Sequence, residues 1–231
     1  MPRPRRLLDA PRGEPESETW DAGTVLYRVH NNTRPAEKFN PRPADPHFQG
    51  GRFDATRYGA PYPYSYVSLD VATAIAETVF RDKIFTDDTQ STPRVRVADR
   101  RLSEVVLEVP ARLVSLVSGP SLSSLHADAW LVTAEEQEYA FTRRYGHWIR
   151  EMVPWAQGFV WRSRRNPPAT TGILFGDRFP GLDHGDGVLS PGKADPLDLK
   201  GGKGLRLVRE VGKTFHVAVA PERVRPTKVV R

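Results

Sequence analysis

Hydrophobic and polar positions alternate with the period of a β-strand in several short segments of the chain. The first is 24–30, where one strand face carries Leu26, Arg28 and His30 and the other carries Val25, Tyr27 and Val29. A second alternating segment, 62–69, leads directly into a helical pattern. Further short strands are predicted over 104–109, 112–116, 158–163 and 172–175, with a closing hairpin over 205–210 and 214–218.

Two segments have the period of an amphipathic helix. In 70–80, Asp70 is the expected N-cap, the apolar stripe faces the core, and Glu77 lies at the edge between core and solvent. In the other, Thr133-Ala134-Glu135-Glu136 has the form of a capping box, and the apolar pattern continues toward Val153. A carboxylate placed like Glu77 is able to face a cleft.

These elements predict an α+β fold: a compact single domain whose short strands form a twisted, mostly antiparallel sheet with two or three packed helices. We expect a flexible N-terminal tail over 1–20 and one domain over 21–231, with a loop insertion at about 177–204 and a C-terminal extension. No apolar run reaches the roughly 20 residues of a membrane helix or resembles a signal peptide. We therefore expect a cytoplasmic protein.

Composition narrows the classes of partner. The 231 residues include no cysteine, which excludes disulfides and thiolate metal sites and fits a reducing compartment. The net charge of +6 suggests nucleic acid, an anionic small ligand or an acidic partner. Because the arginines are scattered along the chain, composition favours a partner other than nucleic acid.

Several standard catalytic motifs are missing. The sequence has no G-x-S-x-G, no H-E-x-x-H and no nucleotide P-loop, which argues against the hydrolases and nucleotide triphosphatases that use them. The segment Asp183-His184-Gly185-Asp186 suits either a cation loop or, more simply, a solvated turn. We expect no metal site.

Polar residues within the predicted core elements are candidates for a site. Arg28 lies mid-strand beside Leu26, so its guanidinium needs a carboxylate or an anionic ligand. His30 shares that face, where a structural hydrogen bond is the simpler role. Arg52 follows Gly50 and Gly51, which permit close backbone approach, and its fork of donors matches phosphate oxygens.

Three further positions each have an ordinary structural alternative. Tyr66 is either a core aromatic or a ring that stacks on a flat heterocycle. Glu77 either pairs with Arg81 one helical turn later or faces a cleft. Ser163 shares a strand face with Phe159 and Trp161, and serine is common at strand ends.

Taken in order, these residues resemble the RES domain family, named for its Arg, Glu and Ser. The resemblance rests on Leu26-Tyr27-Arg28-Val29-His30, Gly50-Gly51-Arg52-Phe53-Asp54, Tyr66-Val67-Ser68 with Ala74 and Glu77, and then Ser163, and it covers about 25–176. Phe53 and Asp54 depart from the Trp and Asn of many members.

The resemblance implies a fold related to ADP-ribosyltransferases and a bacterial toxin that degrades NAD, most simply as an NAD phosphorylase, neutralised by a helix-turn-helix, Xre-like antitoxin. It implies that Arg28 and Arg52 hold the pyrophosphate or an incoming phosphate, that Tyr66 stacks on nicotinamide, and that Glu77 binds its ribose. Ser163 would help to fix the ligand.

Within this expectation, Arg52, Glu77 and Arg28 are the catalytic candidates. The candidates for substrate binding are Tyr66, Ser163, Gly51, Tyr27 and His30. NAD is a substrate, inorganic phosphate is a candidate co-substrate, and no prosthetic group is expected. Two alternatives remain open: an ADP-ribosyltransferase that modifies a host protein, and a non-catalytic basic module that binds nucleic acid.

Overall fold

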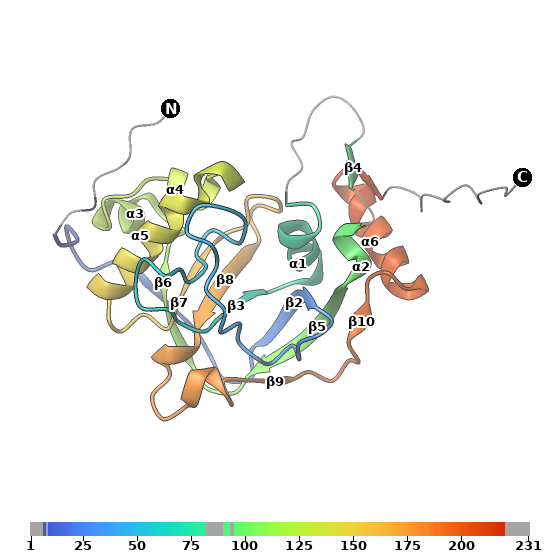
Figure 1. Ribbon diagram of the computed structural model, residues 1–231, viewed down its shortest axis with the longest axis horizontal. Coiled ribbons are helices and arrows are strands. Elements are labelled where there is room, and N and C mark those ends of the chain that lie inside the picture. Colours follow the sequence, from blue (N-terminus) through green and yellow to red (C-terminus); the bar gives the residue numbers. More distant parts are fainter. Residues whose placement is uncertain (1–6, 8, 82–89, 93–94, 220–231) are drawn as a thin grey trace, which may run out of the picture.

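The computed structural model describes residue 7 and residues 9–81, 90–92 and 95–219 (Figure 1). Its helices and strands form an α+β domain with one large sheet, as the sequence predicts. None of the described helices is long and apolar enough to cross a membrane.

The large sheet contains nine strands and is mostly antiparallel. Eight follow the order β1-β6-β7-β8-β3-β2-β5-β10, β9 also pairs with β5, and β6 and β7 are the parallel pair. Their bounds are β1 Ser17–Trp20, β2 Val25–Asn31, β3 Tyr64–Ser68, β5 Arg100–Leu107, β6 Ala111–Ser115, β7 Gly158–Arg162, β8 Thr170–Phe175, β9 Leu189–Pro191 and β10 Leu197–Asp198. The two remaining strands, β4 (Gln90–Thr92) and β11 (Val217–Val219), form a separate parallel pair.

The longer helices cover different parts of the sheet (Figure 1). The helices are α1 Val71–Thr78, α2 Val95–Ala98, α3 Gly119–Ser124, α4 Trp130–Thr133, α5 Tyr139–Met152 and α6 Gly202–Thr214, with short 3-10 turns at Glu136–Glu138, Gly176–Arg178 and Asp183–Gly185. Asp70 caps α1 as predicted, because its carboxylate accepts from the Thr73 amide at 2.8 Å.

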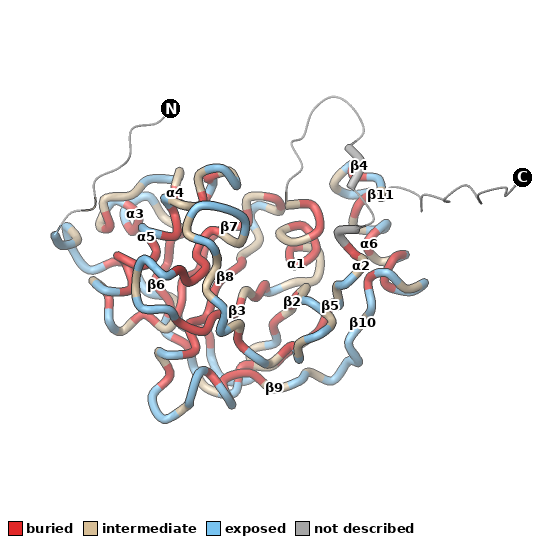
Figure 2. The backbone as a smooth tube through the Cα atoms, in the orientation of Figure 1, coloured by how far each residue is buried: buried red, intermediate tan, exposed pale blue. Residues whose placement is uncertain are grey.

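Buried side chains form three clusters. Figure 2 marks the buried residues in red along the strands of the sheet and the helices that cover it. The period-two alternation divides β7 between two of them: Phe159 and Trp161 pack toward α5, while Val160 packs in the cluster of the opposite face. The third cluster joins α1 to α6. The helix that carries Glu77 is therefore held between the sheet and the C-terminal segment.

One gap in the sheet positions the site. Strands β2 and β3 pair at a single position, Tyr27 opposite Ser68, whereas β2 pairs with β5 along its whole length. Tyr66 lies two residues from Ser68 and shares the face of Tyr27, so Arg28 belongs to the opposite face. Where the two strands part, residues of both faces line one cavity.

Three sequence predictions need correction. The hairpin predicted over 205–218 is wrong in its first half, because 205–210 belongs to α6, where Leu205 and Val208 are buried on one helical face. The long helix begins later than predicted, because the capping box is formed by Glu135 and Glu138. The predicted tail is too long, because 17–20 forms β1 and pairs with β6.

Candidate active site

A cavity of about 610 Å³ opens between β2, β3, α1 and the 33–54 loop. It is lined by seven of the eight predicted site residues: Tyr27, Arg28, His30, Gly51, Arg52, Tyr66 and Glu77. Of the described residues that line it, six are arginines and three are carboxylates. This excess of positive charge suits an anionic ligand.

The eighth predicted residue, Ser163, contacts Glu77 directly. Its hydroxyl donates to Glu77 Oε1 at 2.6 Å and accepts from the backbone amides of Arg165 and Asn166 at 3.2 and 2.9 Å. Because Ser163 is buried and fixed by these amides, it orients the carboxylate from behind the cavity wall. Asn166 also donates to Thr73 on α1, at 2.8 Å, so the 163–166 turn is anchored to the helix itself.

Arg81, which the sequence offers as one alternative partner for Glu77, also contacts two other segments. Its Nη1 atom donates to the Gly50 carbonyl at 3.1 Å, and its Nη2 atom lies 3.6 Å from the Glu136 carboxylate. Arg81 therefore links the end of α1 to the glycine turn and to the segment that precedes α5.

The glycine turn packs closely against Tyr66. A Cβ atom on Gly51 would lie 2.5 Å from the Tyr66 hydroxyl, so only glycine fits there. The same hydroxyl accepts from the Phe53 amide at 2.9 Å, and burial raises the pKa of Tyr66 well above its usual value. Asp54 completes the turn by accepting from the Gly51 amide at 2.8 Å. Asp54 was not among the predicted site residues, although it stands two residues after Arg52 in the same motif.

Arg52 is buried and only partly satisfied. Its Nη2 atom donates to the Ala134 carbonyl at 3.3 Å, and its guanidinium lies 5.4 Å from the Tyr139 ring centroid. Its Nε atom is buried without a hydrogen-bond partner in the described part of the chain. A buried donor of this kind is expected to meet a ligand.

Arg28 has carbonyl partners rather than the carboxylate considered from the sequence. Its Nη1 atom donates to the backbone oxygens of Ala36 and, at 3.2 Å, Lys38. Burial and the nearby charge of Arg34 lower its pKa to about 10, so Arg28 remains a cation at neutral pH.

His30 shares the strand face of Arg28. Its ring nitrogens contact Ser103 Oγ at 2.8 Å and the Asn31 carbonyl at 3.0 Å. Burial, followed by the charge of Arg28, lowers the pKa of His30. His30 therefore combines the predicted structural hydrogen bond with a place on the cavity wall.

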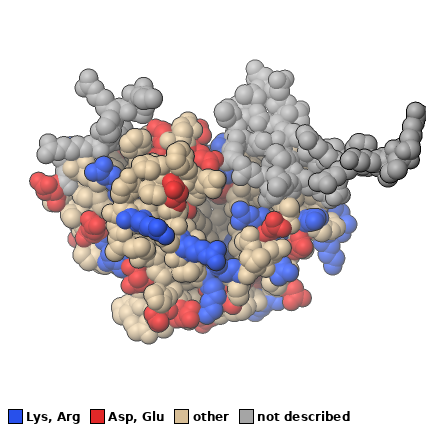
Figure 3. All heavy atoms as spheres, viewed as in Figure 1, with Lys and Arg blue, Asp and Glu red and all other residues tan. Residues whose placement is uncertain are grey.

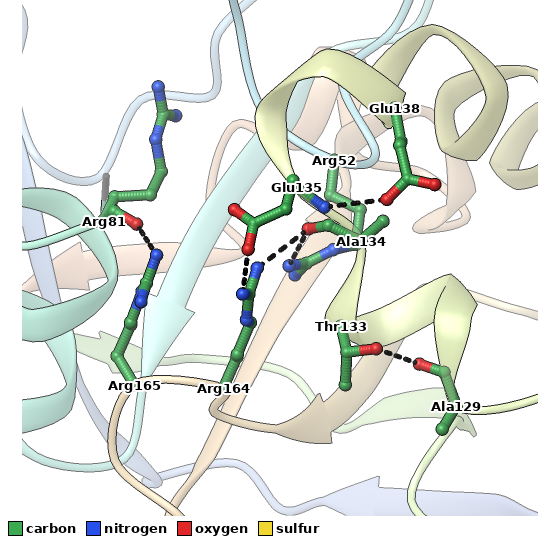
Figure 4. Close-up of polar contacts among 9 residues, drawn as sticks. All are labelled: Arg52, Arg81, Ala129, Thr133, Ala134, Glu135, Glu138, Arg164 and Arg165. Atoms are coloured by element: carbon green, nitrogen blue, oxygen red, sulfur yellow. Dashed lines mark hydrogen bonds and ion pairs between the residues drawn. The ribbon is translucent and has the colours of Figure 1, made fainter. Parts of the chain in front are cut away.

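A second cavity of about 180 Å³ adjoins the first and shares Arg52, Glu77, Arg81 and Tyr139 with it. Figure 4 shows Arg164 pointing toward Glu135 and Ala134, and Arg165 pointing toward the Arg81 carbonyl. Arg164 pairs with the Glu135 carboxylate, and Arg165 donates to the Arg81 carbonyl.

These two arginines were not among the site residues predicted from the sequence. The only signal available was the cluster Arg162-Ser163-Arg164-Arg165 at the end of a predicted strand.

The cation loop considered from the sequence is a solvated turn. His184 lies 3.4 Å from the Asp183 carboxylate, and both side chains are largely exposed. Within 9–81, 90–92 and 95–219, no group of three or more His, Asp or Glu side chains is arranged to hold a metal ion.

The site residues all fall within one family match. The model of the RES domain matches residues 25–190. This chain belongs to the RES domain family. The match includes the arginines, Glu77 and Ser163 that suggested the resemblance, and it ends before α6 and β11 of this RES-domain protein.

Comparison of structures gives the same fold. A chain of the crystal structure of the M. tuberculosis MbcT–MbcA toxin-antitoxin complex aligns with a TM-score of 0.57 and 13% identity, covering 84% of this chain and 91% of that chain. The search of curated proteins gave no match. The α+β fold predicted from the sequence is therefore confirmed.

Proposed function

We propose that this RES-domain protein is a toxin that cleaves the nicotinamide–ribose bond of NAD, with inorganic phosphate as acceptor. The observation that carries the proposal is the Glu77 carboxylate, fixed by the Ser163 hydroxyl at 2.6 Å on a wall shared by two arginine-lined cavities. The other proposed site residues surround it in the larger cavity.

The arginines supply binding and position. NAD carries an anionic pyrophosphate, and Arg28 together with the unpaired Nε of Arg52 offers donors for it. Tyr66 then supports the nicotinamide ring, and Glu77 accepts from the ribose hydroxyls. Tyr27, His30 and Gly51 complete the wall around the bound substrate.

Glu77 acts on charge that develops during the reaction. As the C–N bond to nicotinamide breaks, its electron pair leaves with nicotinamide, and positive charge grows on the ribose carbon. A fixed carboxylate in a partly buried site stabilises that charge. A phosphate oxygen then forms the new bond, which gives ADP-ribose 1-phosphate and neutral nicotinamide. Arginines that hold phosphate beside the ribose increase the rate by proximity.

A cognate antitoxin follows from the same proposal. The M. tuberculosis relative is described as part of a toxin-antitoxin complex. We infer that this chain is likewise neutralised by a partner protein, of the Xre-like helix-turn-helix type, and that it acts in the cytoplasm, where NAD is available.

The test incubates the purified chain with NAD, with and without phosphate, and identifies the products by chromatography and mass spectrometry. We expect NAD loss that depends on phosphate and yields ADP-ribose 1-phosphate. Intact NAD under both conditions would refute the proposal. ADP-ribose as the product would make water the acceptor, and a labelled protein in lysate would make the chain an ADP-ribosyltransferase.

The alternative of a basic nucleic-acid module predicts a continuous positive surface. On the face shown in Figure 3, Lys and Arg side chains are interspersed with Asp and Glu. Such a surface does not favour the phosphate backbone of nucleic acid over other partners. Salt-sensitive DNA binding with full toxicity of Glu77→Ala would support that alternative.

A further inference from the structure

An exposed aromatic side chain, Phe48, stands at the mouth of the larger cavity. Phe48 is 73% exposed, the largest value among the exposed large hydrophobic side chains described, and it lines the cavity. Exposed aromatics are common on protein surfaces, so exposure alone assigns no role. The backbone around Phe48 provides a further, independent observation.

The backbone that carries Phe48 is fixed from two sides. Asp45 Oδ1 accepts from the amides of His47 and Phe48 at 2.8 and 3.0 Å. From α5, the buried Arg143 guanidinium donates to the carbonyls of Asp45, Phe48 (3.4 Å) and Gly51 (3.0 Å). A buried cation therefore holds the segment in place.

The next two residues adopt the left-handed region, with φ of 56° at Gln49 and 77° at Gly50. A non-glycine residue at positive φ is uncommon and is retained only where its surroundings require it. On the other side, the His47 ring packs edge-on against Phe48, with centroids 6.2 Å apart. The turn thus presents a flat apolar ring to solvent in a defined orientation.

We propose that Phe48 stacks on the adenine of the dinucleotide and so selects an adenylate-bearing substrate. This inference rests on the proposed function. Glu77 is held at the inner wall by buried Ser163, so the nicotinamide ribose lies there. With the pyrophosphate on the arginines, the other end of the dinucleotide reaches the mouth, where Phe48 stands.

A purine suits this position because aromatic rings stack on the π-face of a base without needing hydrogen bonds. Binding then orders only the Phe48 side chain, since its backbone is already fixed. The aromatic therefore adds affinity at the end of the substrate that does not react.

The experiment uses calorimetry on the full chain to measure the Kd of two ligands. ADP-ribose contains adenine, and nicotinamide mononucleotide lacks it. We expect Phe48→Ala and Phe48→Leu to weaken ADP-ribose binding by about 5-fold or more, because stacking on one base has that size. Phe48→Trp should retain the wild-type affinity for ADP-ribose. Phe141→Ala is the matched control, since Phe141 is exposed on α5 and does not line the cavity.

The outcomes separate the two proposals. Unchanged ADP-ribose affinity in Phe48→Ala, or no ADP-ribose binding by the wild type, overturns the stacking role. An equal loss for nicotinamide mononucleotide overturns the assignment to adenine. Weakened neutralisation by an antitoxin with unchanged ADP-ribose affinity would make Phe48 a partner contact and overturn the stacking role as well. If ADP-ribose binds through Phe48 but NAD stays intact, stacking stands and the proposed cleavage fails.

Discussion

The orientation of Glu77 is set from outside the cavity. The Ser163 hydroxyl contacts the Glu77 carboxylate and accepts hydrogen bonds from two backbone amides of its own turn. The hydroxyl proton is therefore directed to the carboxylate. In the described part of the chain, the hydrogen bonds to this carboxylate all go to Oε1, so the second carboxylate oxygen is left for a ligand. Glu77 is therefore expected to act on the reaction and Ser163 to act through Glu77.

Glu77→Gln should lower kcat for NAD cleavage by about 10²-fold or more, because an amide cannot stabilise the positive ribose carbon as a carboxylate does. The Kd for NAD should change little. Product formation measures kcat, and calorimetry measures the Kd. Glu210→Gln, on the exposed face of α6, is the control. A variant with weaker NAD binding and unchanged kcat would contradict this role.

Ser163→Ala should lower kcat by about 10-fold, the size of a hydrogen bond to a charged group. Ser65→Ala provides the comparison, because Ser65 is equally buried and its hydroxyl has no partner in the described residues. Steady-state kinetics of both variants check the prediction. Equal effects from the two substitutions would mean that Ser163 has only a packing role.

At the scale of elements, the loop that carries the Gly-Gly-Arg motif is attached to α5. His147 Nε2 accepts from the Thr56 amide at 3.0 Å and is buried. Burial, followed by the charge of Arg150, lowers the pKa of His147 to about 4. The ring is therefore neutral in the folded protein above about pH 4.

This lowered pKa makes stability depend on pH. Below about pH 6.5 the unfolded chain protonates His147, whereas the folded chain does so only near pH 4. The contribution is fully present above pH 6.5 and is lost progressively as the pH falls toward 4.

Urea unfolding at pH 7.5 and pH 5 measures this loss. His147→Gln should reduce the difference between the two pH values, since glutamine does not titrate. If the variant keeps the full pH difference of the wild type, other groups cause it.

Helical and strand patterns in the sequence identified β2, β3 and α1, but they missed β1, β9 and β10 and misassigned α6 as a strand. The periodicity of α1 and its Asp70 cap are local, and both are confirmed. The alternating apolar residues of 205–210 also fit a strand, and only packing of Leu205 and Val208 against the α1 cluster selects the helix. The local sequence preference for helix or strand is weak in such a segment, and burial against other elements decides between the helical and the strand period.

At the scale of the whole molecule, α6 lies beyond the family match yet belongs to the same hydrophobic cluster as α1. Four of its residues are buried: Gly204, Leu205, Val208 and Gly212. The C-terminal segment therefore supports the helix that carries Glu77.

Leu205→Ala should destabilise the fold by about 2–4 kcal/mol, because it removes buried apolar contacts and leaves a cavity beside α1. Arg206→Ala, at an exposed neighbouring position, should stay within about 0.5 kcal/mol of the wild type. Urea unfolding measures both. A negligible effect of Leu205→Ala would show that α6 does not contribute to the stability of the domain.

The sequence by itself determined the strand and helix that carry Arg28 and Glu77, because periodicity and capping are encoded locally, and the order of motifs identified the RES domain. Only the tertiary structure decided that Ser163 reaches Glu77 across 86 residues of sequence. It also decided that Arg28 and Tyr66, from opposite sheet faces, line one cavity where β2 and β3 part. Such contacts depend on how distant elements pack, and no local pattern records them.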